Sequence, residues 1–107
     1  MDRVRVEQLR DGLPRRLNAG ILMGDGGFCI LGWALFSIGF HPISVYGNTL
    51  AVVDPARGGP VIDVVAREYG LERDQVVALA GANDAAPSDE RVDAVRAVLD
   101  AFLARER

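Results

Sequence analysis

Cys29 is the residue whose type and position first suggest chemistry. It follows a glycine-rich turn and precedes a strongly apolar run, so it stands where a helix is expected to begin. A helix N-terminus lowers the pKa of a thiol, and several cysteine hydrolases place their nucleophile there. Such an enzyme also needs a base, but the one histidine, His41, lies at the far end of the same predicted helix, about 18 Å away at 1.5 Å per residue. We therefore expect a buried structural thiol, with a cysteine hydrolase as the weaker alternative.

The remaining polar motifs predict neither a metal site nor a cofactor site. One cysteine and one histidine are too few for the usual zinc sites. The turn Asp25-Gly26-Gly27 lacks the basic residue and the spacing of a phosphate-binding loop. Asn83 and Asp84 are interpreted as a polar turn that fixes the backbone. We therefore expect no catalytic residue, no cofactor and no enzymatic activity.

A helix–glycine–helix pattern between Val61 and Leu79 matches the helix-turn-helix spacing, with Ala66 followed four residues later by Gly70. That pattern enforces packing and does not enforce DNA contact. The second helix offers Arg73 as its only basic residue beside two acids, whereas base edges and phosphates favour Arg, Lys, Asn or Gln. A packed helical corner is therefore favoured. In the alternative, a DNA-binding unit over 61–80, Arg73 reads bases and the phosphates are bound by Arg3, Arg5, Arg15 and Arg16.

The charge pattern gives no general drive towards nucleic acid. All twelve basic residues are arginine, a bias typical of high-GC bacteria and their phages, and the formal charge is −3. Residues 1–16 carry five arginines against three acids, or +2, whereas residues 54–107 carry seven against eleven, or −4. The N-terminus is polar and arginine-rich, so no signal peptide is expected and the cytoplasm is the predicted location.

The apolar run from Phe28 to Phe40 predicts a buried central helix. It carries no charged residue and ends before His41-Pro42. A helix that is apolar on all sides lies inside a domain or a membrane, and 13 residues fall short of the roughly 20 that a span needs. We therefore expect no membrane span and an interior position for Trp33.

The other segments predict an α+β fold that is mostly helical, in one globular domain over 1–107. Residues 3–11 favour a helix ending at Gly12. The segments 43–46 and 49–53, separated by Gly47-Asn48, predict a β-hairpin. A C-terminal three-helix unit follows, with helices from Pro60 to Gly70, from Arg73 to a stop at Gly81, and from a Ser88 cap onward.

Several of these pieces also occur together in one known group of proteins. They are Leu9-Arg10-Asp11-Gly12, Asp25-Gly26-Gly27-Phe28-Cys29-Ile30-Leu31-Gly32, Gly70-Leu71 and Leu79-Ala80-Gly81-Ala82-Asn83-Asp84. In this pattern, D-G-x-F-C-x-L-G followed by L-x-x-x-N-D, the chain resembles small phage and actinobacterial proteins of unknown function. The resemblance implies a soluble accessory protein of phage or host and implies no activity.

Together these observations predict a small non-enzymatic accessory or regulatory protein that acts by binding another protein. The partner is unidentified, and a homodimer is one of the open alternatives. Nucleic acid is the less favoured partner.

Overall fold

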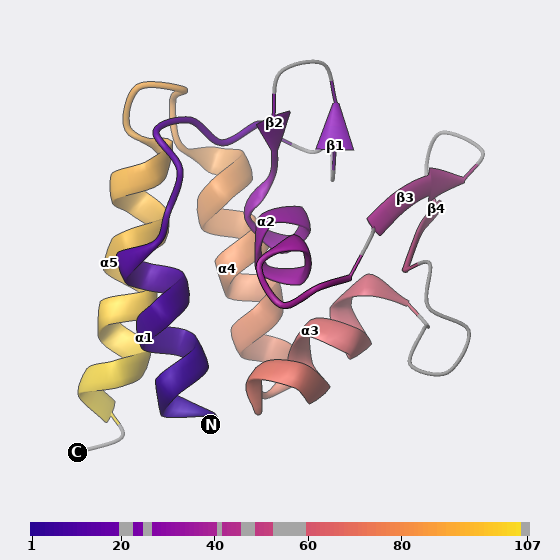
Figure 1. Cartoon of the computed structure of the whole chain (residues 1–107). Coiled ribbons are helices and arrows are strands. Elements are labelled where there is room, and N and C mark those ends of the chain that lie inside the picture. Colours follow the sequence, from indigo (N-terminus) through magenta and orange to yellow (C-terminus); the bar gives the residue numbers. More distant parts are fainter. Residues whose placement is uncertain (20–22, 25–26, 41, 46–48, 53–59, 106–107) are drawn as a thin grey trace.

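Five helices carry the fold in the part of the chain that the structure describes (Figure 1). The computed structural model describes residues 1–19, 23–24, 27–40, 42–45, 49–52 and 60–105. The helices are α1 (Arg3–Asp11), α2 (Ile30–Phe36), α3 (Val61–Tyr69), α4 (Arg73–Ala85) and α5 (Arg91–Arg105). The strands are β1 (Met23–Gly24), β2 (Gly27–Phe28), β3 (Pro42–Val45) and β4 (Thr49–Val52).

The predicted α+β class is wrong, because the helices form the body of the described chain, and the segments predicted as a β-hairpin form only a two-stranded ribbon rather than a sheet layer. The described strands pair only in twos, β1 with β2 and β3 with β4, both antiparallel. The β3–β4 ribbon lies on the side of the molecule away from α5 (Figure 1). Two-stranded ribbons are marginal alone, and a fold class is set by packed layers. The expected turn at Gly47-Asn48 lies outside the described residues.

The central helix α2 is shorter than the sequence predicts. It spans seven residues, Ile30–Phe36, and Phe28 belongs to β2. The chain leaves the helix through Gly39, whose φ is +93°, while the N–H of Phe40 donates to the carbonyl of Leu35 at 3.0 Å. That is the glycine-assisted ending of many helices. Five residues of α2 are buried, but Phe36 is 47% exposed, so one edge of the helix reaches the surface.

The α3–α4 corner begins as predicted, and α4 then runs past its predicted end. Gly70 ends α3 in the left-handed conformation, with φ of +63°. A reciprocal capping box between Glu72 and Gln75 starts α4, which continues through Gly81 to Ala85. A glycine inside a helix weakens it without ending it. The pair Asn83-Asp84, predicted as a turn, is therefore helical.

The core lies where the five helices meet. α1 packs against α5 and α3, while α4 packs against α5, α3 and α2. Their buried side chains form one apolar cluster, whose largest fully buried members are Tyr69, Phe40, Ile30, Leu35, Leu79 and Leu99. The hydroxyl of Tyr69 donates to the carbonyl of Ala34 at 2.6 Å and so joins α3 to α2. None of the described helices is long and apolar enough to cross a membrane.

Alanine substitution at two glycines, Gly70 and Gly81, should change the free energy of unfolding in opposite directions. At Gly70 a Cβ would lie 2.9 Å from the backbone nitrogen of Asp2, in a left-handed conformation, so Gly70→Ala should lower the free energy of unfolding by about 1–2 kcal/mol. At Gly81 a Cβ meets nothing within 4 Å, so Gly81→Ala should raise it by about 0.5–1 kcal/mol. Urea unfolding measures both, and equal stability of the two variants would contradict this account of the corner.

Candidate functional site

Asn83 is the one buried polar side chain among the described residues, 1% exposed. Its Oδ1 accepts a hydrogen bond from the backbone N–H of Ile30 at 3.1 Å. Its Nδ2 donates to the carbonyl of Asn18 at 2.8 Å and to Oδ1 of Asp84 at 3.1 Å. One carboxamide on α4 thus holds the start of α2 and the segment that follows α1.

Arg91 completes this joint from the first turn of α5. Its guanidinium donates to three backbone carbonyls, those of Asn83 at 2.7 Å, Leu17 at 2.9 Å and Ala86 at 3.1 Å. Two of these carbonyls belong to the C-terminal end of α4, where carbonyls lack helical partners. Sequence reasoning missed Arg91, because the only local signal is a cation a few residues past a helix end.

The structure brings Cys29 to the same joint. Cys29 is the N-cap of α2 and is 8% exposed. Burial raises the pKa of its thiol, backbone N–H groups of Gly32 and Leu31 oppose that shift, and the charge of Asp84 adds to it. A nucleophilic cysteine needs the opposite, a lowered pKa and an accessible sulfur. His41, the base that sequence analysis considered, lies outside the described residues.

Trp33 is half-buried, whereas the sequence analysis expected it in the interior. It packs edge-on against Phe28, with ring centroids 5.8 Å apart, and lies 6.1 Å from Phe36. Its indole N–H has no acceptor among the described residues. Trp33 is half-buried because it lies with Phe28 and Phe36 at the edge of α2 that reaches the surface.

Three of the five arginines assigned to the DNA alternative are occupied by neighbouring groups. Arg73 pairs with Asp63 at 2.5 Å. Arg3 pairs with Glu7 and donates to the carbonyl of Leu103, and Arg5 donates to the carbonyl of Glu68. These contacts hold helices together rather than leaving a basic surface.

Arg15 and Arg16 differ from them, because they make no hydrogen bond or ion pair within the part of the chain that the structure describes. They lie on the segment that Arg91 and Asn83 anchor at the C-terminal end of α4. Arg73 begins α4, ten residues before Asn83, or about 15 Å along the helix. The structure therefore does not gather the five arginines into one surface.

The outer face of α4, defined here as its exposed residues, combines apolar and charged side chains. Its basic member, Arg73, is paired with Asp63, its acidic members are Asp74 and Asp84, and its largest apolar side chain, Val77, is 49% exposed. The face consists of Arg73, Asp74, Val77, Ala78, Gly81, Asp84 and Ala85.

No group of three or more His, Cys, Asp and Glu side chains is placed to hold a metal ion within the described ranges. Comparison with protein-family models, curated protein sequences and solved structures finds no match to this chain.

The Cys29 thiol should react slowly with a thiol reagent near neutral pH, because it is buried and its pKa is raised. A thiol pKa that is higher in the folded chain than in the unfolded chain stabilises the fold below the unfolded value and loses that effect as pH rises through the folded value. Stability should therefore fall above pH 9.0, the ordinary value, and fall less steeply in Cys29→Ala. Rapid stoichiometric labelling at pH 7 would contradict a structural thiol.

Asn83→Ala should lower the free energy of unfolding by about 2–3 kcal/mol, since it leaves the buried N–H of Ile30 without an acceptor and opens space in the core. The matched control is Gln8→Ala on the exposed side of α1, expected within about 0.5 kcal/mol of the parent. Denaturant unfolding compares the two, and similar values would remove the joint as a main support of the fold.

Proposed function

We propose that the protein is a small non-enzymatic accessory or regulatory protein that acts by binding another protein. The observation that carries the proposal is the outer face of α4. A half-exposed Val77 and its small neighbours leave an uncovered apolar stretch of helix, and the basic side chain of this face, Arg73, is held in an ion pair with Asp63. The buried centres of protein–protein interfaces are poor in charge and richer in apolar groups than the surrounding surface. This face fits that description.

The same face argues against the DNA-binding alternative. In a helix-turn-helix protein the second helix enters the major groove and needs donors for bases and phosphates. Here that helix is α4, whose exposed acids repel phosphates and whose Arg73 is held by Asp63. The corner formed by α3 and α4 has a sufficient structural reason, because it buries Tyr69, Val76 and Leu79.

The cysteine hydrolase alternative is weakened by the environment of Cys29. Its sulfur is buried, and its pKa is raised where a nucleophile needs it lowered. Cys29 belongs to the cluster of buried apolar side chains that forms the core, and this position favours a structural role for its thiol.

Val77→Glu should abolish partner binding, because it places a charge in the middle of an apolar contact. The matched control is Val4→Glu on α1, at a valine that is 63% exposed on a different helix. Tagged parent and variant chains are compared by capture from a lysate of a high-GC bacterium with quantitative mass spectrometry. Sedimentation of the purified chain tests a second copy as the partner. A captured protein lost with Val4→Glu and retained with Val77→Glu would refute the assignment to α4.

Any affinity for duplex DNA should be weak and should show a shallow salt dependence. Only Arg15 and Arg16 among the five candidate arginines are without partners in the described chain, so they neutralise at most two phosphates. The slope of log affinity against log salt should then be no steeper than about −1.8, at about −0.9 per phosphate. A selection on random duplexes provides the second readout. Enrichment of a defined sequence that Arg73→Ala abolishes would promote the DNA-binding alternative.

A further inference from the structure

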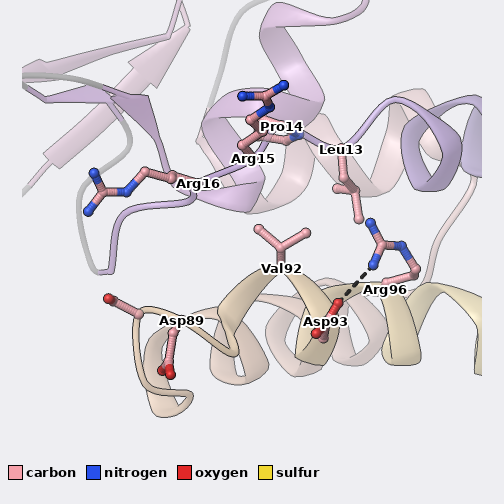
Figure 2. Close-up of a pocket in the computed structure, with 9 residues that line it drawn as sticks. Leu13, Pro14, Arg15, Arg16, Asp89, Val92, Asp93 and Arg96 are labelled. Carbon is pink, nitrogen blue, oxygen red and sulfur yellow. Dashed lines mark hydrogen bonds and ion pairs between the residues drawn. The ribbon is translucent and has the colours of Figure 1, made fainter.

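A cavity of about 460 Å³ lies between the segment after α1 and the start of α5 (Figure 2). This volume is within the range of about 300–1,000 Å³ that is usual for ligand pockets. In Figure 2, Val92 on α5 points towards the segment that carries Pro14, Arg15 and Arg16. The cavity is lined by Leu13, Pro14, Arg15, Arg16, Ser88, Asp89, Val92, Asp93 and Arg96.

The walls of this cavity are well supported. Leu13 and Val92 are half-buried and pack against the core, so they form an apolar floor. The segment that carries Arg15 and Arg16 is fixed by two hydrogen bonds just beyond them. The carbonyl of Leu17 accepts from Arg91, and the carbonyl of Asn18 accepts from Asn83. A site held in this way is formed before its ligand arrives, which lowers the entropic cost of binding.

The cavity is locally positive on an acidic protein. Three arginines against two aspartates give its lining a formal charge of +1, whereas the whole chain carries −3. Arg96 and Asp93 neutralise each other in an ion pair of 2.9 Å. In Figure 2 Arg15 points away from α5 and Arg16 extends to the side, so their guanidinium groups lie apart from each other on the rim of the cavity, outside its apolar floor. Asp89 remains on the α5 side.

From this arrangement we infer that the cavity docks an extended acidic peptide segment of a protein partner, with an apolar side chain on the floor of Leu13 and Val92 and one carboxylate beside each of Arg15 and Arg16. Arginine binds carboxylates through paired, charge-assisted hydrogen bonds. The inference rests on the proposed function, because it specifies the chemistry of the partner's segment.

The two aspartates favour a peptide over a nucleic acid. A nucleic-acid strand carries a negative charge about every 3.4 Å, so a bound strand would bring phosphates close to Asp89 as well as to the arginines. A peptide avoids that repulsion, because it can place an acidic residue at the arginine rim and a neutral or basic residue beside Asp89.

A random peptide display selection on the full chain tests this inference. We expect enrichment of short sequences that combine an acidic residue with an apolar one. The synthetic peptide enriched most strongly should bind at least about tenfold more weakly to Arg15→Ala/Arg16→Ala, because two charge-assisted contacts are lost. The matched control is Arg105→Ala, an exposed arginine without a partner in the described chain. Asp89→Lys should strengthen binding, and higher salt should weaken it.

Three results would overturn the inference: no enrichment, enrichment of basic peptides, or binding that the double arginine variant leaves unchanged. Stronger competition by a single-stranded oligonucleotide than by the peptide would also overturn it, in favour of nucleic acid. Val77→Glu separates this inference from the proposed function. It should leave peptide binding intact while removing capture through α4, so a failure of this inference is distinguishable from a failure of the proposed function.

Discussion

The carboxamide of Asn83 holds three segments of the chain at one buried point, and the surrounding structure depends on that contact. A buried amide is costly unless its donors and acceptor are satisfied, because water is absent and the local dielectric is low. Here Oδ1 of Asn83 accepts a hydrogen bond from the N–H of Ile30 at the start of α2. Its Nδ2 donates to the carbonyl of Asn18 and to Oδ1 of Asp84. The position of α2, and with it Cys29 and the aromatic trio, follows from this satisfied group.

Three arginines of this protein act as structural donors to backbone carbonyls of other segments. Arg3 and Arg5 donate to carbonyls on α5 and α3, and Arg91 donates to three carbonyls around the end of α4. The planar guanidinium suits this role, since it presents five N–H groups in a fixed geometry. An arginine-rich N-terminus is therefore no sign of a nucleic-acid surface here. The N-terminal arginines without a partner in the described chain are Arg15 and Arg16, which lie beside a cavity with an apolar floor.

The α3–α4 corner illustrates how a packing pattern resembles a functional motif. Gly70 allows the left-handed turn, and its lack of a Cβ admits the N-terminus, where the N–H of Asp2 donates to the carbonyl of Tyr69 at 2.9 Å. Tyr69 then reaches Ala34 on α2. These requirements produce the spacing of a helix-turn-helix without any demand from DNA, so the functional argument has to come from the exposed face of α4.

Short-range signals in the sequence predicted what short-range physics controls. The helix of residues 3–11 and the stop at Gly70 depend on caps, glycine conformations and i, i+4 contacts, and these predictions are confirmed. The fold class, the length of α2 and the end of α4 were predicted wrongly. The fold class depends on which elements pack together in layers. The lengths of α2 and α4 depend on whether tertiary contacts outweigh the helix-ending tendency of a single residue such as Gly81. The joint of Asn83 with Arg91 contains hydrogen bonds between residues 53, 65 and 74 positions apart, and the cavity beside it lies between the segment after α1 and the start of α5. No local pattern encodes such contacts, because their hydrogen bonds exist only once the helices have been brought together.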